Sequence, residues 1–595
     1  MNGQKKTIYH LKKTNALEWF SRVIKCQYTC PVHTNVPAYV KLLREGDFEG
    51  AYKVNRVANL FPAILGRLCP HPCEDVCRRG RFDEPVSICA LKRAAADYSE
   101  KETELPLGIE AITKKQGKRI AIIGSGPAGL ACANDLALRG YDVVIYEALD
   151  RIGGMLNVGI PPYRLPRKLI QQEISRVMSA LGVEIKLNTP IGEKLTLGNL
   201  RKEYDAIFIA AGAHKSIKLG IEGEALQGVI PAVEFLRKIN LGETPEIGRK
   251  VVVIGGGDVA MDCVRTVIRL GAESVHIKCL ESREEMPAAD FEVEEAIQEG
   301  AILRPSLGLK RILGKDGKVT GVETVVCKSV FDSQGRFNPT FVEGTESIIK
   351  ADNIIVAIGQ ASDLSLLQKQ EGFEVVRGRT IKVDPESLHT TVPGVFAGGD
   401  VATGPRLLID AIAQGHKAAQ SIHAYLTQSK IPQKRAHFKL VKDYTPPVGY
   451  DALSREKLRA IPVDERRQDI WQARIYLFMK KLRAIPVNER RGLDLEVDLG
   501  LSKDAIQREA MRCYQCQLNI VIDSKKCVLC GGCVDVCPNK CIRMVSLDRI
   551  KGLDNVTNKG AALVMNEEEC MRCGLCVQRC PTRAINMVEF SVEEV

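Results

Sequence analysis

Residues 118–129 read KRIAIIGSGPAG, a hydrophobic run that leads into a glycine-rich turn. Such a run, bounded by turn residues and followed by a helical pattern, predicts a buried parallel strand entering a helix. At the spacing of Gly124, Gly126 and Gly129, the first glycine allows a tight turn, the second lets the backbone approach a pyrophosphate, and the third permits close helix–strand packing. Glu147 ends the next strand-like run, and we expect it to accept hydrogen bonds from an adenosine ribose. The stretch therefore predicts a Rossmann-like dinucleotide site.

A second stretch of the same kind, KVVVIGGGDVA, occupies residues 250–260, with Gly255 and Gly257 in its turn. Two such units predict two dinucleotides, and a flavin with a nicotinamide is the economical pairing for hydride transfer. The strand that follows ends at Glu281, whose carboxylate can bind ribose hydroxyls and would repel a 2′-phosphate, which favours NADH over NADPH. Arg283 lies two residues further on, can reach a phosphate, and argues in the opposite direction.

The composition places these units in a larger, multidomain chain. Its 595 residues exceed what one core supports, and 45% hydrophobic with 26% charged residues argues against disorder. No run of about 18 apolar residues predicts a membrane span, and no apolar segment follows Lys5 and Lys6 to suggest secretion, so we expect a cytoplasmic protein. The net charge of +11 permits acidic partners, and we expect no nucleic-acid partner.

The 21 cysteines gather at the two ends of the chain, six before residue 90 and eleven from residue 513 to residue 580. In a reducing compartment such cysteines are more often metal ligands than disulfides. Four lie singly in the middle and are expected to be small buried residues: Cys132, Cys263, Cys279 and Cys327.

The C-terminal cysteines carry the strongest motif in the chain, CxxCxxCxxxCP, which occurs twice. This spacing predicts two [4Fe–4S] clusters, with the fourth cysteine of each run binding the other cluster, and it disfavours isolated zinc sites. One predicted ligand set is Cys527, Cys530, Cys533 and Cys580, and the other is Cys537, Cys570, Cys573 and Cys576. Cys541 is left over and is assigned to packing.

Several further segments together resemble one family. Thr390–Pro405 (TTVPGVFAGGDVATGP) is similar to the second flavin motif of two-dinucleotide-domain flavoproteins, in which an aspartate, here Asp400, binds the ribityl chain. Gly159–Pro166, Gly255–Thr266 and Ser282–Ala288 resemble the glutamate synthase small-subunit family. That family includes the NADPH-oxidising half of dihydropyrimidine dehydrogenase and the large subunit of NADH-dependent ferredoxin:NADP oxidoreductase. The resemblance spans residues from about 20 to 430.

The resemblance implies that FAD and NAD(P)H exchange hydride and that electrons pass on to iron–sulfur clusters. Leu280 and Glu281 stand where NADPH-type members usually carry arginines, which supports NADH. No acid–base constellation for an organic substrate is left over, so no protein residue is predicted to be catalytic. The predicted cofactor-binding residues are Gly124, Gly126, Pro127, Ala128, Gly129, Glu147, Gly154, Met155, Leu156, Gly399 and Asp400 for FAD, and Gly255, Gly257, Asp258, Val259, Glu281 and Arg283 for NAD(H).

The N-terminal cysteines resemble part of the two-cluster domain of the same family, most closely in GRLCPHPCEDVCRRG (66–80). Fuller versions of that domain begin with a CxxC in a REAMRC-like helix, which is missing before Cys26 but present at 507–516. We therefore expect residues 507–516 to fold back onto the N-terminal domain. The ligand set expected for one cluster is Cys26, Cys77, Cys513 and Cys516, and that for the other is Cys30, Cys69 and Cys73. The fourth ligand of the second cluster is a glutamine in dihydropyrimidine dehydrogenase, and Cys89 lies near that position here, which makes four clusters in the chain. The alternative is that Cys513 and Cys516 are a remnant and that only one N-terminal cluster exists.

Residues 431–505 contain a near-perfect repeat, KLRAIPVDERR (457–467) and KLRAIPVNERR (481–491). Two copies are too few for a solenoid, so a duplicated linker is the simpler interpretation, and a basic docking element is the alternative. The expected fold is multidomain: a helical iron–sulfur domain (1–105), two Rossmann-like α/β domains, one for FAD in two parts (118–225 and 352–430) and one for NAD(H) (226–351), the basic linker (431–505), and the CxxC segment with an α+β ferredoxin-like domain (506–595).

These features predict an NADH-dependent iron–sulfur flavoprotein that exchanges electrons with ferredoxin or with a partner oxidoreductase subunit in a hetero-oligomeric complex. The alternatives are the electron-input subunit of a glutamate synthase and a non-catalytic electron-transfer scaffold. The intact glycine turns, with Glu147 and Asp400, argue against the scaffold.

Overall fold

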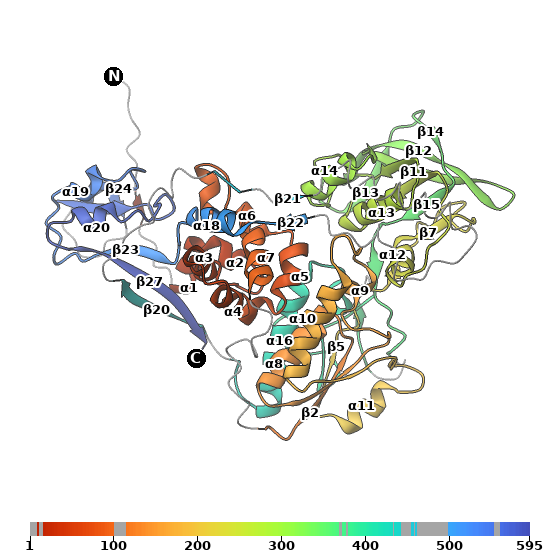
Figure 1. Ribbon diagram of the computed structural model, residues 1–595, viewed down its shortest axis with the longest axis horizontal. Coiled ribbons are helices and arrows are strands. Elements are labelled where there is room, and N and C mark those ends of the chain that lie inside the picture. Colours follow the sequence, from red (N-terminus) through yellow and green to blue (C-terminus); the bar gives the residue numbers. More distant parts are fainter. Residues whose placement is uncertain are drawn as a thin grey trace.

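The structure, a computed structural model, places a helical region at the centre, two α/β domains on one side of it and a small C-terminal domain on the other (Figure 1). The residues that it describes are 9–10, 16–99, 115–367, 372–376, 379–431, 434–441, 454–456, 459–460, 498–551 and 560–594.

Short helices build the central region, in agreement with the helical domain expected at residues 1–105. Asn35 and Asp47 cap two of these helices, accepting hydrogen bonds from the backbone N–H groups of Ala38 and Gly50. The helices are α1 (Ala16–Val23), α2 (Lys25–Thr29), α3 (Val36–Glu45), α4 (Phe48–Asn59), α5 (Pro62–Leu68), α6 (Pro72–Asp75) and α7 (Ile88–Tyr98), with the 3₁₀ turn η1 (Arg78–Arg81).

A helix from far along the chain completes this region. Helix α18 (Lys503–Met511) packs on α3 and α7, and its Ile506 is fully buried among their apolar side chains. Residues 507–516 therefore fold back onto the N-terminal domain, as the REAMRC-like phrase predicts.

The first α/β domain is a five-stranded parallel sheet in the order β19–β5–β2–β3–β4. Its strands are short, apolar runs buried on both faces, which is typical of parallel sheets covered by helices. The elements are β2 (Arg119–Ile123), β3 (Asp142–Tyr146), β4 (Glu184–Lys186), β5 (Ala206–Ile209) and β19 (Val395–Ala397), with helices α8 (Pro127–Leu138), α10 (Arg167–Ala180) and α16 (Leu408–Thr427).

The second α/β domain is a parallel sheet in the order β10–β9–β8–β15–β7. An antiparallel sheet formed by β11 (Leu307–Lys315), β12 (Lys318–Phe331), β13 (Phe337–Phe341) and β14 (Ser347–Lys350) adjoins it. The parallel sheet and its helices are β7 (Val229–Pro231), β8 (Lys250–Ile254), β9 (Ser274–Lys278), β10 (Ile302–Arg304), β15 (Asn353–Val356), α12 (Ala232–Asn240), α13 (Asp258–Arg269) and α14 (Asp290–Gln298).

The expected boundary at residue 352 is wrong for β15. This strand was assigned to the FAD domain, yet it lies between β8 and β7 in the second sheet, with Ile354 and Ile355 fully buried. Its apolar sequence is compatible with the buried core of either sheet, and only its hydrogen-bond pairing with β8 and β7 shows to which sheet it belongs. The chain rejoins the first sheet at β19, so that domain is discontinuous, as expected.

The C-terminal domain is built on an antiparallel sheet in the order β20–β27–β23. Strand β20 (Lys434–Val441) pairs with β27 (Ile585–Glu594) along its whole length, so this part of the expected linker is an edge strand instead. The remaining elements are β23 (Leu518–Ile522), α19 (Gly532–Asp535), β24 (Ile542–Ser546), β26 (Ala561–Met565) and α20 (Leu575–Arg579).

Other described pieces of the expected linker also pack on the folded domains. The Arg455 guanidinium pairs with the Glu74 carboxylate at 2.5 Å, and β21 (Arg459–Ala460) pairs with β22 (Asp498–Gly500). The repeat at 457–467 and 481–491 lies outside the described residues except for β21. Among the helices in the described ranges, none combines the length and the apolar character that crossing a bilayer requires.

Replacing Ile506 with alanine tests the docking of α18. The side chain is fully buried in the N-terminal core, so Ile506→Ala should cost about 2–5 kcal/mol of unfolding free energy through lost burial and a residual cavity. Urea unfolding followed by the visible absorbance of the iron–sulfur chromophores measures this loss. Gln507→Ala, on the exposed face of the same helix, is the matched control. Equal midpoints for the two variants would contradict the docking.

Candidate functional site

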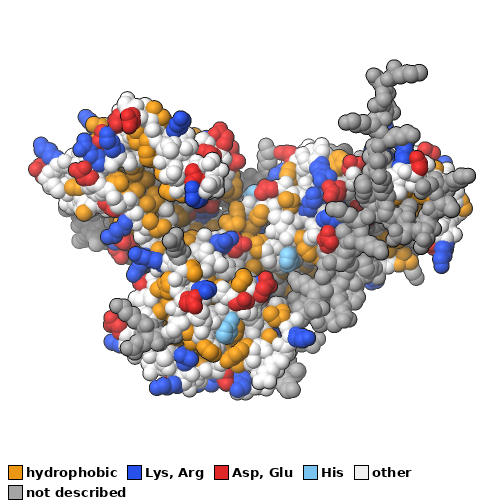
Figure 2. Space-filling view, turned by 180° about the vertical axis from the view of Figure 1, so that it is seen from behind, with side chains coloured by type: hydrophobic (Ala, Val, Ile, Leu, Met, Phe, Trp, Pro, Cys, Tyr) orange, Lys and Arg blue, Asp and Glu red, His pale blue; other side chains and the backbone are white. Residues whose placement is uncertain are grey.

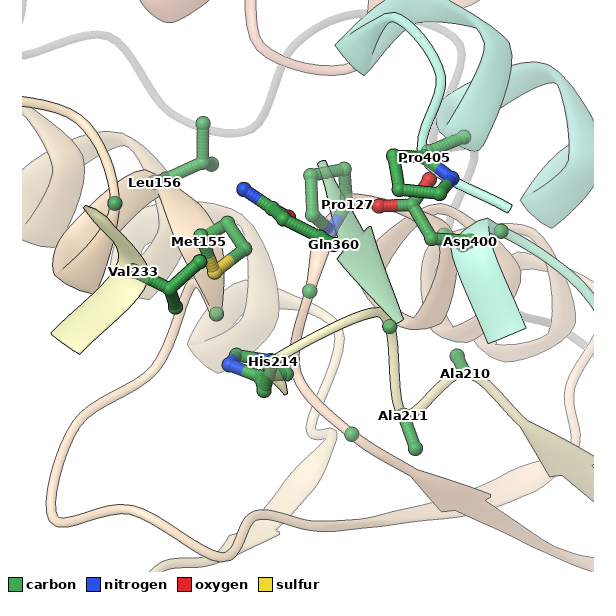
Figure 3. A pocket seen from close by; sticks show the side chains of 18 of the residues that line it. Pro127, Met155, Leu156, Ala210, Ala211, His214, Val233, Gln360, Asp400 and Pro405 are labelled. Carbon is green, nitrogen blue, oxygen red and sulfur yellow. The ribbon is translucent and has the colours of Figure 1, made fainter. Parts of the chain in front are cut away.

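A cavity of about 560 Å³ lies where the two α/β domains meet. On the face seen in Figure 2, apolar side chains gather along the hollow between these domains. In Figure 3, Met155, Leu156 and Val233 approach the cavity from one side, and Pro127, Gln360 and Asp400 from the other. Twelve of the predicted cofactor-binding residues line this cavity: Gly124, Gly126, Pro127, Ala128, Glu147, Gly154, Met155, Leu156, Asp258, Val259, Gly399 and Asp400.

The first glycine turn has the predicted geometry. Gly124 has φ +104°, and a Cβ there would lie 2.5 Å from the carbonyl oxygen of Ala210. A Cβ on Gly129 would lie 2.1 Å from the carbonyl oxygen of Gly124, so the helix can pack only on a glycine. A Cβ on Gly126 would meet nothing within 4 Å, which leaves open space in front of the N-terminus of α8. The turn therefore fits a pyrophosphate, which the N-terminal N–H groups of a helix bind well.

Two carboxylates stand in the FAD half of the cavity. Glu147 is buried at the end of β3, where it accepts hydrogen bonds from the Ser125 N–H at 2.9 Å and the Leu149 N–H at 2.9 Å. Asp400 begins α15 (Asp400–Thr403), accepts a hydrogen bond from the Arg406 N–H at 3.2 Å, and burial raises its pKa to about 6. A glycine cradle with one oriented carboxylate at the strand end and another at a helix start fits the ribose and ribityl groups of a flavin dinucleotide.

The second glycine turn resembles the first. Gly255 has φ +136°, and a Cβ there would lie 2.2 Å from the carbonyl oxygen of Ala357. A Cβ on Gly256 would lie 3.1 Å from Oε2 of Glu281, so this carboxylate stands beside the turn. Arg283 instead forms an ion pair with Asp290 at 2.9 Å. The predicted residues that do not line the cavity are Gly129, Gly255, Gly257, Glu281 and Arg283.

A buried ion network joins the two domains beside this cavity, and it was not predicted. Arg164 Nη1 lies 2.8 Å from both carboxylate oxygens of Asp262, and Arg164 also pairs with Glu292. Arg265 pairs with Glu292 at 3.2 Å and, further out, with Glu299 at 3.0 Å. Arg164 and Asp262 lie in two of the quoted family motifs. The motifs identify these segments, but they do not indicate that the two side chains form an ion pair.

His214 is another cavity residue that the sequence did not reveal. Its Nδ1 lies 2.9 Å from Nη2 of Arg237, and burial together with this cation lowers the pKa of His214. The imidazole is therefore neutral at pH 7.

The N-terminal cysteines and the CxxC of residues 513–516 surround two small cavities. Cys26, Cys77, Cys513 and Cys516 line one of about 30 Å³, the set that the folding-back hypothesis predicts. Cys30, Cys69 and Cys73 line the other, of about 20 Å³. Cys89, the fourth expected ligand there, does not line this cavity, and its thiol donates to the Cys69 carbonyl oxygen at 3.6 Å.

A buried lysine faces the second of these cavities. Lys92 on α7 is 7% exposed and lines the cavity together with the three cysteines. Burial by itself would lower the pKa of Lys92, but the neighbouring sulfurs of Cys69 and Cys89 raise it above its ordinary value. The ammonium is thus kept charged next to the cysteines, which suits a site that holds a negatively charged cluster.

A buried carboxylate holds the CxxC segment in place. Glu509 on α18 is fully buried and accepts hydrogen bonds from the Ser87 N–H at 2.7 Å and the Glu456 N–H at 2.6 Å. It also accepts one from Arg512 at 2.9 Å, and Arg512 binds Asp83 at 3.0 Å. These contacts bring Cys513 and Cys516 against the N-terminal cysteines.

The C-terminal cysteines form two groups. Cys537, Cys570, Cys573 and Cys576 line a cavity of about 20 Å³, together with Cys541. Cys541 was expected only to pack; it is buried, but its sulfur also lies 3.3 Å from that of Cys537. In the other group, burial raises the pKa of Cys533, and so do the adjacent sulfurs of Cys527, Cys530 and Cys580.

The cysteine sets fit iron–sulfur clusters by their donor chemistry. Each of the two C-terminal groups contains its four predicted thiols, divided between the CxxCxxCxxxCP runs as expected, and Cys541 is a fifth thiol in the second group. Within the described residues, no three His, Cys, Asp or Glu side chains are arranged to hold a single ion. The four cysteines expected to be structural, Cys132, Cys263, Cys279 and Cys327, are all buried, as predicted.

Three family models match the chain. The pyridine nucleotide-disulphide oxidoreductase model matches residues 118–415. The model of dihydropyrimidine dehydrogenase domain II, 4Fe-4S cluster, matches residues 5–104, and the 4Fe-4S dicluster domain model matches residues 526–584. Together they cover both α/β domains, the N-terminal cysteines and the two CxxCxxCxxxCP runs.

Curated relatives extend over most of the chain. The NADP(+)-dependent formate dehydrogenase subunit beta of Moorella thermoacetica is 42% identical over 475 residues, covering 75% of this chain and 67% of that protein. The NADPH-Fe(3+) oxidoreductase subunit beta of Geobacter sulfurreducens is 37% identical over 519 residues, covering 82% and 75%. The glutamate synthase [NADPH] small chain of Escherichia coli is 36% identical over 423 residues, covering 67% and 88%.

These matches confirm the resemblance to the glutamate synthase small-subunit family and the cofactor classes predicted from the motifs. The chain belongs to the pyridine nucleotide-disulphide oxidoreductase family and, within it, is an iron–sulfur flavoprotein that transfers electrons between a nicotinamide nucleotide, FAD and [4Fe–4S] clusters.

Proposed function

We propose that the chain oxidises NADH and delivers the electrons, through FAD and four [4Fe–4S] clusters, to a partner oxidoreductase subunit or ferredoxin. The supporting observation is the single cavity that the glycine turn of the FAD domain shares with Asp258 and Val259 of the nicotinamide domain. Bound FAD would supply the change from two-electron hydride chemistry to one-electron transfer.

The protein's own contribution at this cavity is positioning and exclusion of water. Val233 brings apolar surface from the nicotinamide domain to the side of the cavity opposite Pro127 and Asp400, and Leu236 and Val259 line the same cavity. The Arg164–Asp262 pair fixes the second domain against the first. Hydride transfer between stacked rings requires alignment and no general base.

We propose NADH as the preferred nucleotide on the basis of Glu281. Its carboxylate stands beside Gly256, where a 2′-phosphate would meet a negative charge, while Arg283 is engaged by Asp290. The three relatives described above are named for NADP(+) or NADPH, so this preference is proposed as a property of the present chain.

A partner subunit is the acceptor we favour. The Moorella and Geobacter relatives are each named as a subunit beta. The electron-input subunit of a glutamate synthase is the second candidate, since the small chain of Escherichia coli matches over 88% of its own length.

Two glycine substitutions test the two dinucleotide turns separately. An added methyl group meets no protein atom within 4 Å at Gly126, and at Gly257 only Pro287, at 4.0 Å, so either variant should fold. Gly257→Ala should raise the NADH concentration needed for anaerobic flavin bleaching by about tenfold or more while FAD content stays unchanged. Gly126→Ala should instead lower FAD content. If Gly257→Ala bleaches at the NADH concentration that the wild type requires, the second glycine turn is not part of the nicotinamide site. If the wild-type protein itself does not bleach, the non-catalytic scaffold is favoured.

Substitution of Glu281 tests nucleotide choice. Glu281→Ala removes the carboxylate beside Gly256 and should increase the NADPH-to-NADH ratio of kcat/KM by about tenfold, the effect of losing one charge–charge contact near a protein surface. Glu284→Ala, on the exposed part of the same loop, is the matched control. An unchanged ratio would show that Glu281 does not select the nucleotide.

Iron analysis tests the cluster partition. Four clusters contain about sixteen iron atoms per chain. If Cys513 and Cys516 are a remnant, only three clusters remain, which contain about twelve. The double variant Cys513→Ser/Cys516→Ser should lose about four iron atoms relative to the wild type. Cys327→Ser, in the nicotinamide domain, should lose none. A wild-type value of about twelve would refute the four-cluster proposal.

A further inference from the structure

A buried arginine connects the N-terminal cysteines to the C-terminal domain. Arg78 begins η1 directly after Cys77 and is only 4% exposed. Its Nη1 donates to the sulfur of Cys516 at 3.8 Å, within the first N-terminal cysteine cavity. Its Nε donates to the carbonyl oxygen of Glu568 at 3.3 Å, and its Nη2 donates to that of Glu567. One side chain therefore touches a predicted ligand of one domain and the backbone of the other.

A second buried arginine continues the contact on the far side. Arg572 is 1% exposed, and its Nη1 donates to the same Glu567 carbonyl oxygen at 3.2 Å and to the Cys570 carbonyl oxygen at 3.1 Å. The Glu567 carbonyl thus accepts hydrogen bonds from both arginines. A continuous chain of hydrogen bonds runs from the Cys516 sulfur to the backbone of Cys570.

A short covalent route runs in parallel. Only Gln517 separates Cys516 from Leu518, the first residue of β23, and the Leu518 carbonyl oxygen accepts a hydrogen bond from Arg572 Nε at 2.6 Å. The Leu518 side chain packs in the same apolar cluster as Cys570. Both routes lead to the cavity that contains Cys570, whereas Cys530, in the other C-terminal group, is exposed to solvent.

We propose that electrons cross between the two ends of the molecule at this junction of Arg78, Glu567 and Arg572. The inference rests on the proposed function and specifies the order in which the clusters pass electrons. The cluster held by the N-terminal set at Cys516 exchanges electrons with the cluster held by the C-terminal set at Cys570. With clusters bound by both cysteine sets, each event would oxidise the N-terminal cluster by one electron and reduce the C-terminal cluster by one, with no bond formed or broken and no proton transferred.

Arg78 acts as a positioning residue in two physical ways. Its hydrogen bonds to the Glu567 and Glu568 carbonyls fix the separation of the two domains, and its side chain is buried between them. Its buried charge beside the Cys516 sulfur stabilises the more negative, reduced form of the adjacent cluster, because a cation in a low-dielectric site favours neighbouring negative charge.

Three variants of the full-length chain test the role of Arg78. Arg78→Met removes the charge and the hydrogen bonds, and Arg78→Lys keeps the charge. Arg81→Met is the matched control, because Arg81 is exposed and contacts Glu568 at 3.0 Å without reaching a cysteine. Each is mixed anaerobically with NADH and followed by stopped-flow absorbance and freeze-quench EPR.

In Arg78→Met we expect flavin bleaching at the wild-type rate and reduction of the C-terminal clusters slowed by about tenfold or more, because the hydrogen bonds that hold the two domains at a fixed separation are lost. The midpoint potential of the N-terminal cluster should shift to a more negative value, Arg78→Lys should retain most of the wild-type potential, and Arg81→Met should match the wild type. Wild-type reduction of the C-terminal clusters in Arg78→Met would overturn the proposal.

A measurement on the unaltered protein covers the case in which Arg78→Met loses iron. Pulsed EPR of the reduced wild-type chain should show the strongest magnetic coupling across the domains between the Cys516 and Cys570 clusters, with Cys530→Ser used to identify the signal of the other C-terminal cluster. Stronger coupling to the Cys530 cluster would overturn the inference. Failure of the wild-type flavin to bleach with NADH would instead refute the proposed function.

Discussion

The buried carboxylate of Glu509 is the contact on which the arrangement of the two chain ends depends. It is fully buried, and it accepts two backbone N–H groups and the Arg512 guanidinium. A carboxylate in such a place is stable only when fully paired, and removing one partner of a buried pair costs several kcal/mol, of the order of 3–5 kcal/mol. Because α18 is held in this way, Cys513 and Cys516 face Cys26 and Cys77, and β23 leads directly from them into the C-terminal domain.

The nucleotide cavity depends on a comparable constraint between the two α/β domains. Arg164 from the first domain is clamped by Asp262 and Glu292 of the second, with little access to solvent. The network therefore holds the two domains together at the cavity that Arg164 and Asp262 both line. Charges at a domain junction give it a specific geometry, whereas apolar contact alone would tolerate sliding.

Much of both sites could be predicted from local patterns. The strands at 119–123, 250–254 and 206–209 are apolar runs that end at glycine turns, and each forms where its pattern indicates. Strand β15 was assigned to the wrong sheet because an all-apolar run carries no information about which neighbours it will pair with. The sequence predicts a linker where β20 lies, because a short edge strand rich in lysine and arginine has the composition of a surface segment.

The sequence by itself determined the donor types, the ligand spacings and the turn geometries. These depend on residues within a few positions of one another, where covalent connectivity limits the possible backbone conformations. Only the tertiary structure decided which cysteines share a cavity, that Lys92 and Arg78 face them, and that Cys541 lies beside Cys537. Cys26 and Cys516 are separated by most of the chain, and what brings them together is the burial of α18 against α3 and α7. That burial is a sum of many weak apolar contacts and a few paired charges, which no local spacing records.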